Sequence, residues 1–219
     1  MANVFLIGAT GGIGSRLATA LLQRGHQVSG LFRDQAQRAK LIAQRVTPVF
    51  GDLMNLRHAD MRQMIEGHDA VVFSAGAAGS GENRTTQIDG KGPVTVTRAM
   101  EDLGLTRFYL VSAFPEAGRG RASSPGFEHY MQTKKAADSE VCQTALDWVI
   151  VRPGTLTNEI TSRGVRAGYA IPYGEVAREY VAQFLAELID QPSIRRRIIE
   201  LTNGSGSIRR SVAQFMELV

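Results

Sequence analysis

The sequence predicts an α/β fold, in which a doubly wound parallel sheet carries helices on both faces and ends in a small C-terminal extension. Short apolar runs alternate with longer amphipathic segments as far as Val151, and a glycine-rich turn follows the first run. Strands that alternate with helices favour right-handed crossovers and parallel pairing. The chain has 219 residues, 43% of them hydrophobic, which is enough to bury a substantial core. We therefore expect one domain over residues 1–219.

Six short apolar runs predict strands that are buried on both faces. They are Val4–Ile7, Val28–Phe32, Val46–Phe50, Ala70–Phe73, Phe108–Val111 and Trp148–Val151. The amphipathic segments between them predict helices at about 12–24, 35–44, 56–66, 87–103 and 127–145. Two stretches rich in small residues, 75–84 and 113–126, follow strands, so we expect long loops at the ligand-binding edge of the sheet.

The pattern changes after Val151, where Arg152-Pro153-Gly154 ends a strand. We expect an irregular region to about Gly174. A helix near 175–190, a strand at Arg197–Leu201 and a final helix near 207–219 complete the chain. This part, about 152–219, is too short for a separate domain and predicts a small extension on the substrate side.

Composition and charge argue against several classes of protein. The 25 basic and 21 acidic residues give a net charge of +4 and are spread along the chain, so we expect no nucleic-acid partner. No run approaches the ~18 apolar residues of a membrane helix, and no basic region precedes the first apolar run, so we expect neither a membrane span nor a signal peptide. The lone Cys142 fits a cytoplasmic protein and predicts a small buried residue of a helix. We expect no metal site.

The glycine-rich turn, Gly8-Ala9-Thr10-Gly11-Gly12-Ile13-Gly14, lies between a predicted strand and a predicted helix. Glycines at such a turn permit a tight bend, close approach of a diphosphate, and close packing of helix on strand. Free N–H groups and the helix dipole then favour the negative charge. The alternative is an ordinary glycine-rich turn. We favour a dinucleotide site whose cofactor-binding residues are Gly8, Thr10, Gly11, Gly12, Ile13 and Gly14.

Arg33 follows the second predicted strand, about 20 residues beyond the glycine turn. An acidic residue there binds the ribose 2′-hydroxyl of NAD, whereas an arginine accommodates the 2′-phosphate of NADP. The sequence therefore favours NADP(H), with NAD(H) possible. Asp34 is expected to cap the next helix rather than to bind ribose. Arg38 and Lys40 are more typical of a solvated helix face than of a second phosphate contact.

Two further segments follow the third and fourth predicted strands. Asp52, in Gly51-Asp52-Leu53, is expected to accept a hydrogen bond from the adenine amino group, with Leu53 beside it. The small residues Ser74, Ala75 and Gly76 leave room for the cofactor to cross the sheet edge. Turn formation is the alternative for both segments, and the glycine turn upstream favours cofactor contact.

Tyr130 and Lys134 are four residues apart on a predicted helix, so their side chains share a face. A phenol with its ordinary pKa near 10 is a poor acid–base group at neutral pH. A nearby ammonium and an oxidised nicotinamide ring lower that pKa. The pair then predicts proton transfer to a carbonyl oxygen while hydride reaches the carbon.

These motifs together resemble the short-chain dehydrogenase/reductase superfamily, especially its atypical branch of small NAD(P)H-binding oxidoreductases. That branch includes flavin/biliverdin reductases and epimerase/dehydratase-like proteins. The resemblance covers nearly the whole chain, with further motifs at Arg107–Ser112, Leu146–Gly154, Leu156-Thr157 and Glu200–Thr202. It implies an NAD(P)-binding Rossmann fold, contact of Lys134 with the nicotinamide ribose, and a nicotinamide end lined by the segment from Pro153 to Leu156.

The chain departs from the superfamily pattern after the fifth predicted strand. A catalytic serine or threonine is usual there, a position or two beyond a first serine. Here the run is Val111-Ser112-Ala113-Phe114, so Ser112 is the candidate that orients substrate. Ser74-Ala75-Gly76 stands where relatives carry Asn-Asn-Ala-Gly. Cofactor binding is therefore predicted more firmly than dehydrogenase chemistry.

We expect an NADP(H)-dependent oxidoreductase that reduces a small carbonyl, quinone or flavin-like molecule. The alternative is a non-catalytic NADP(H)-binding redox sensor or scaffold, because a catalytic hydroxyl is missing. A sugar epimerase is less favoured, since the extension is small. Both a monomer and a homodimer fit the sequence.

Overall fold

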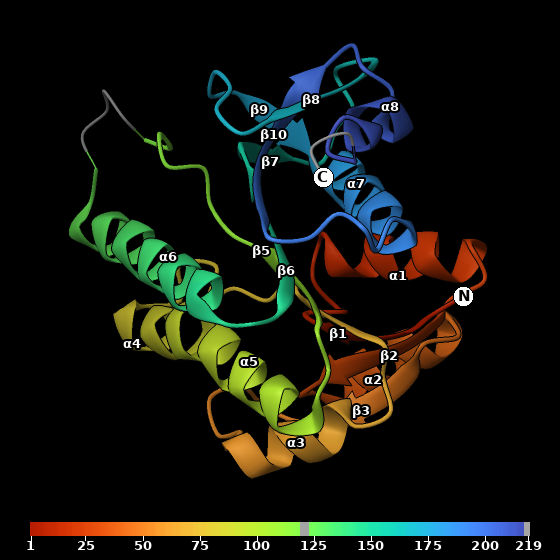
Figure 1. Cartoon of the computed structure of the whole chain (residues 1–219). Coiled ribbons are helices and arrows are strands. Elements are labelled where there is room, and N and C mark those ends of the chain that lie inside the picture. The colour runs from red at the N-terminus through yellow and green to blue at the C-terminus, as the bar shows by residue number, and fades with distance from the viewer. Residues whose placement is uncertain (119–122, 217–219) are drawn as a thin grey trace.

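The computed structural model describes residues 1–118 and 123–216, and its centre is an eight-stranded sheet. The strand order is β3-β2-β1-β4-β5-β6-β10-β8, with helices on both faces (Figure 1). All pairs are parallel except β10 with β8, which is antiparallel. The strands are β1 (Asn3–Ile7), β2 (Gln27–Phe32), β3 (Thr47–Phe50), β4 (Ala70–Phe73), β5 (Arg107–Val111), β6 (Asp147–Pro153), β8 (Gly164–Gly168) and β10 (Arg197–Gly204). The predicted α/β fold with a doubly wound sheet is confirmed, with one antiparallel edge strand that the pattern did not predict.

The helices follow the predicted segments closely. They are α1 (Gly14–Gln23), α2 (Gln35–Ala43), α3 (His58–Ile65), α4 (Glu82–Arg84), α5 (Gly92–Leu103), α6 (Pro125–Gln143), α7 (Arg178–Asp190) and α8 (Ile208–Ala213). A π-helix, η1 (Thr85–Lys91), precedes α5. Pro93 has no N–H to donate to the carbonyl of residue 89, which favours this irregular turn.

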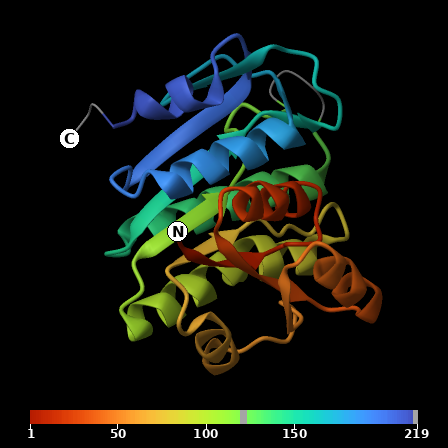
Figure 2. The same ribbon diagram turned by 90° about the vertical axis from the view of Figure 1, so that its right-hand side faces the viewer.

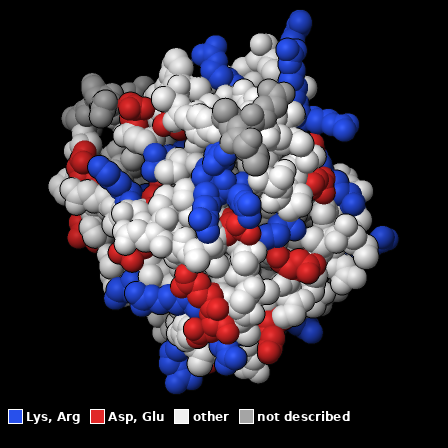
Figure 3. All heavy atoms as spheres, viewed as in Figure 1, with Lys and Arg blue, Asp and Glu red and all other residues white. Residues whose placement is uncertain are grey.

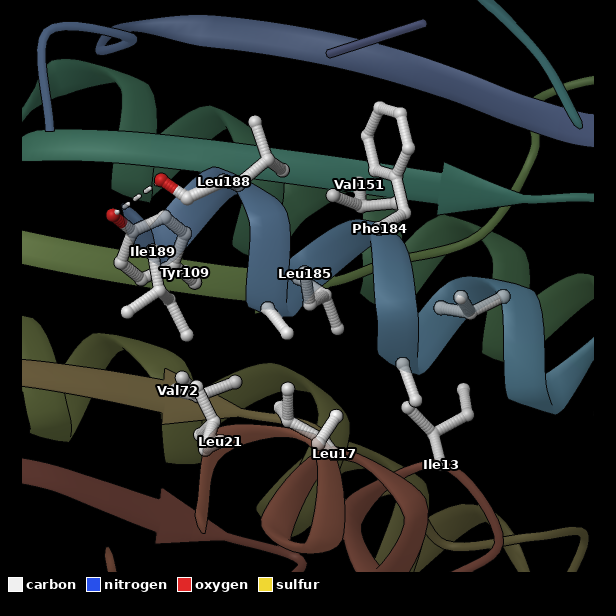
Figure 4. Packing of buried hydrophobic residues seen from close by; sticks show 14 of the residues in the cluster. Ile13, Leu17, Leu21, Val72, Tyr109, Val151, Phe184, Leu185, Leu188 and Ile189 are labelled. Atoms are coloured by element: carbon white, nitrogen blue, oxygen red, sulfur yellow. Dashed lines mark hydrogen bonds between the residues drawn. The ribbon is translucent and has the colours of Figure 1, made fainter. Parts of the chain in front are cut away.

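Alternation along the strands builds a separate core on each face of the sheet. On β1, Val4 and Leu6 belong to one buried cluster, and Phe5 and Ile7 belong to the other. The first cluster lies under α1 and α7, which run side by side in Figure 2, and the second lies under α3 and α5. Figure 4 shows Leu17 of α1 and Leu185 of α7 in the contact between these two helices.

The C-terminal part is more regular than the sequence predicts. The region expected to be irregular contains β7 (Thr155–Thr157) and β8. β7 forms a separate two-stranded parallel sheet with β9 (Glu175–Ala177), which occupies the start of the helix predicted near 175–190. These strands are too short to show a periodicity, and their pairing depends on a close backbone approach, because a Cβ on Gly154 would lie 2.0 Å from the carbonyl oxygen of Gly174. The final helix ends at Ala213. Residues 119–122 of the predicted loop 113–126 and residues 217–219 lie outside the described residues.

Charged side chains, helix length and the lone cysteine can be described for residues 1–118 and 123–216. Basic and acidic side chains are interspersed over the face shown in Figure 3. In the part of the chain that the structure describes, no helix is long and apolar enough to cross a membrane. Cys142 is partly buried on α6, and burial raises the pKa of its thiol.

Candidate functional site

The site lies where the strand order reverses, between the carboxyl ends of β1 and β4. Gly8 follows β1 with a φ of +91°, which glycine adopts without strain. A Cβ at this position would lie 2.6 Å from the backbone nitrogen of Ala75, so the turn after β1 packs directly on the turn after β4. Ser74 joins the two turns, because its N–H and its Oγ donate to the carbonyl of Ile7 at 2.9 and 3.1 Å.

The glycine turn leaves hydrogen-bond donors free at the start of α1. The N–H of Gly11 donates to the carbonyl of Gly8, but those of Gly12 and Ile13 have no protein acceptor among residues 1–118 and 123–216. A Cβ on Gly14 would lie 2.1 Å from the oxygen of Gly8, so Gly14 serves the close packing of helix on strand. Free donors at a helix N-terminus are suited to an anion such as a diphosphate.

A cavity of about 310 Å³ extends from the glycine turn toward β2 and β3. It brings together most of the predicted cofactor-binding residues: Gly8, Thr10, Gly11, Arg33, Asp52, Leu53, Ser74, Ala75 and Gly76. Asp52 Oδ1 accepts the N–H of Met54 at 3.0 Å, so this side chain shapes its own turn as well as lining the cavity.

Arg33 lines this cavity, and Asp34 follows it as the N-cap of α2. The side chain of Asp34 accepts the N–H of Ala36 at 2.7 Å, which confirms the predicted helix cap. Arg33 is exposed and has no carboxylate partner in the described part of the chain. Its charge is therefore available to a ligand in the cavity.

A second cavity, of about 680 Å³, shares Gly11, Ser74, Ala75 and Gly76 with the first. It reaches Ser112 at the end of β5 and both Tyr130 and Lys134 on α6, as their spacing predicts. Ile13 also lines it, and so does Leu156. Pro153 is buried in β6 and is not among the lining residues, although the segment implied by the resemblance runs through it.

Buried charges surround the second cavity. The Nζ of Lys134 donates to the carbonyl of Val111 at 2.9 Å and lies 3.7 Å from Oδ1 of Asp89. Asp89, on η1, also accepts the N–H of Ala77 at 2.9 Å. Burial lowers the pKa of Lys134, and Asp89 and Asp138 oppose this effect. The ammonium is thus held by a carboxylate and a carbonyl.

The pKa of Tyr130 moves in the direction opposite to the expectation. Burial raises it to about 12, and the negative charges of Asp89 and Asp138 add to the effect. The expectation rested on the nearby ammonium and on the charge of an oxidised nicotinamide ring, and it left out the burial of the phenol and the carboxylate of Asp89, which lies 3.7 Å from the Lys134 ammonium. In this structure the phenol is a protonated hydrogen-bond donor.

Asp89 and Asp138 are the site residues that the sequence analysis missed. Asp138 lies one turn beyond Lys134 on the same helix face, so its spacing was a usable signal. Asp89 carried no local signal, because only the packing of η1 against α6 brings it to Lys134.

Asp138 connects the site to β6. Its Oδ2 accepts a hydrogen bond from Nε of Arg152 at 2.9 Å and forms an ion pair with Nη2 at 2.9 Å. Burial raises the pKa of Asp138, and Ser112, Arg152 and Lys134 oppose this. The Ser112 hydroxyl is buried and has no hydrogen bond of good geometry to any described residue. Phe114, where a second hydroxyl would be expected, is fully buried against Tyr173.

Comparisons with known proteins agree with this geometry. A family model described as NAD(P)H-binding matches residues 8–192. The "Uncharacterized sugar epimerase YhfK" of Bacillus subtilis is 30% identical over 212 residues, which cover 96% of this chain and 98% of that protein. A solved structure named "Putative NAD-dependent epimerase/dehydratase" from Bacillus halodurans is 29% identical, with a TM-score of 0.88 over 98% of this chain and all of that one.

A more distant structure shows the fold alone. It is a short-chain dehydrogenase/reductase from Veillonella parvula in complex with NADP, 17% identical, with a TM-score of 0.73 over 95% of this chain and 99% of that one. The family model and the two Bacillus proteins confirm the predicted resemblance to NAD(P)-binding, epimerase/dehydratase-like proteins.

Proposed function

The chain belongs to the NAD(P)H-binding family, and we propose that it is an NADP(H)-dependent oxidoreductase. Its substrate in this proposal is a small carbonyl, quinone or flavin-like molecule. One observation carries the proposal: the cavity that contains Ser112, Tyr130 and Lys134 is continuous with the glycine turn. A cofactor laid along both cavities therefore reaches the residues able to handle a proton.

The residues of the glycine turn fit the diphosphate of a dinucleotide. In the proposal it lies on the free N–H groups of Gly12 and Ile13, with Gly8 and Gly14 keeping the turn close to the sheet. Arg33 holds the 2′-phosphate, because its charge is exposed and Asp34 is occupied as a helix cap. These features support NADP(H) over NAD(H).

The chain's own acid–base group is Tyr130. Bound NADPH supplies the hydride in this proposal. The protonated phenol of Tyr130 donates its proton to the substrate oxygen, Lys134 contacts the cofactor ribose and stabilises the phenolate that remains, and Ser112 orients the substrate.

The first test is a parallel titration with NADPH and NADH, followed by thermal shift or by the fluorescence of Trp148. A ligand at 100 times its Kd adds about 2.7 kcal/mol of stability when it binds only the folded state. We expect selective stabilisation by NADPH in the wild type and loss of that selectivity in Arg33→Ala. Stabilisation by neither cofactor would overturn the proposal.

A second candidate is a non-catalytic redox sensor that binds the same cofactor. The observation in its favour is the buried Phe114, which leaves no second hydroxyl beside Ser112. Turnover separates the candidates: oxidation of NADPH by any quinone, flavin or carbonyl supports the enzyme. Binding without turnover, and a partner whose affinity follows the cofactor's redox state, supports the sensor.

An epimerase is a third candidate, because two similar proteins carry that word in their names. An epimerase reduces and reoxidises its substrate without net consumption of the cofactor. Stoichiometric consumption of NADPH would therefore argue against it.

A further inference from the structure

Among the described residues, Arg178 is the one whose side chain lies against the open side of Gly12. It is the first residue of α7, directly after β9. A Cβ built on Gly12 would lie 2.8 Å from Cδ and 3.0 Å from Nε of Arg178, and no other described atom comes within 4 Å. Gly12 does not need a positive φ. The absence of a side chain there leaves room for the arginine at the glycine turn.

The Arg178 guanidinium is held in place but keeps donors free. Its Nη1 donates to the carbonyl of Leu156 at 3.2 Å and to Oδ1 of Asn158 at 3.0 Å. A guanidinium has five N–H donors, and no carboxylate in the described ranges lies within ion-pair distance of this one. A half-buried positive charge therefore lines the second cavity without an acidic partner.

Arg16, near the same turn, differs from Arg178 in having an acidic partner. Its Nη1 donates to the carbonyl of Gly12 at 2.6 Å, and its Nε lies 3.6 Å from Glu179. Its charge is paired and its hydrogen bond supports the backbone of the turn. Arg178 differs because its hydrogen-bond partners are neutral, so its positive charge can pair with a bound anion.

The packing of α7 fixes this arrangement. Leu17 and Leu185 bury the contact between α1 and α7 (Figure 4). The glycine turn opens α1, and Arg178 opens α7. The distance between them is therefore set by two packed helices rather than by a free loop.

We propose that Arg178 binds the diphosphate of the cofactor and thereby couples cofactor binding to the segment 156–158. This inference rests on the proposed function, because it requires a dinucleotide on the glycine turn. Arginine is suited to the role, since its planar fork makes charge-assisted bonds to two phosphate oxygens. The same guanidinium donates to the carbonyl of Leu156, which lines the second cavity. Arg178 would therefore contact both the bound diphosphate and the segment at the nicotinamide end.

The test measures Kd for NADPH and for NADH in the wild type, Arg178→Ala, Arg178→Lys and Arg166→Ala. Because both cofactors contain the diphosphate, we expect Arg178→Ala to weaken both by the same factor, roughly 10- to 100-fold. Arg178→Lys should fall between the wild type and Arg178→Ala. Arg166 is exposed on β8, and its removal is the control for the same change in net charge. Circular dichroism checks that each variant is folded.

Hydrogen exchange tests the coupling separately. We expect NADPH to slow amide exchange in a peptide that covers 155–160 in the wild type, and to slow it much less in saturated Arg178→Ala.

Three outcomes would overturn the inference. The first is unchanged Kd values in Arg178→Ala, and the second is a loss confined to one of the two cofactors. The third is an equal loss in Asn158→Ala, which keeps the charge but removes a partner. A wild type that binds neither cofactor would overturn the proposed function as well, which separates the two failures.

Discussion

The two ends of the site are built in different ways: the backbone end at the glycine turn, and the charged end around Tyr130 and Lys134. At the glycine turn, the shape comes from close backbone contacts between Gly8, Gly14 and Ala75. At the other end, the pKa values of Tyr130 and Lys134 depend first on burial and then on the charges of Asp89 and Asp138. A site formed by backbone contacts can therefore be predicted from the sequence, whereas a site formed by buried charges can be predicted only in part.

The largest effect that we expect at the charged end is on turnover. Tyr130→Phe removes the proton donor, so the rate with any accepted carbonyl substrate should fall roughly 10²–10⁴-fold, with little change in NADPH affinity. Tyr169→Phe is the matched control, because the Tyr169 ring packs on Phe215. Steady-state kinetics provides the measurement. Undiminished turnover in Tyr130→Phe would remove this residue from the mechanism.

The strongest test of the backbone end compares two glycines that share a positive φ. Gly8 has a φ of +91° and a backbone neighbour 2.6 Å from its missing Cβ, whereas Gly25 has a φ of +82° and no neighbour within 4 Å. We expect Gly8→Ala to cost about 3 kcal/mol of unfolding free energy and to abolish NADPH binding.

Gly25→Ala should lose only about 1 kcal/mol of unfolding free energy, from the strain of a positive φ, and should still bind NADPH. Urea unfolding and cofactor titration measure both variants. Equal costs in the two variants would show that the contact with Ala75 is unimportant.

A smaller effect is expected on the pKa of Tyr130 at the charged end. Asp89→Asn removes a negative charge beside the phenol, so the pKa of Tyr130 should fall from about 12 toward the ordinary tyrosine value. Tyrosinate absorbance, corrected with Tyr130→Phe, reports this pKa. An unchanged pKa would mean that burial alone sets it.

The same shift makes stability depend on pH in a definite direction. Because the folded-state pKa of Tyr130 lies above the unfolded value near 10, the folded state retains the proton that the unfolded state loses. The contribution of Tyr130 is therefore complete below about pH 10 and is lost as the pH rises toward about 12. The wild type should lose more stability than Tyr130→Phe between pH 10 and pH 11, as measured by urea unfolding. A parallel loss in both proteins would contradict the buried, protonated phenol.

Features that depend on neighbouring residues could be predicted from the amino-acid sequence. Apolar runs and glycine spacing predicted the strand–turn–helix unit from Asn3 to Gln23, and helical spacing placed Tyr130 and Lys134 on one face. Local preference also predicted the Asp34 cap. These features follow from steric and hydrogen-bonding rules that act within a few residues.

Contacts between side chains that are distant in the sequence depend on the tertiary structure. Asp89 reaches Lys134 through the packing of η1 on α6, and Arg178 reaches Gly12 through the packing of α7 on α1. The pairing of β7 with β9 likewise required segments separated by β8 to come together. Neither periodicity nor local spacing carries such contacts, because they arise when separate elements bury their apolar faces against one sheet. The direction of the Tyr130 pKa depends on those contacts and so could not be predicted from the sequence.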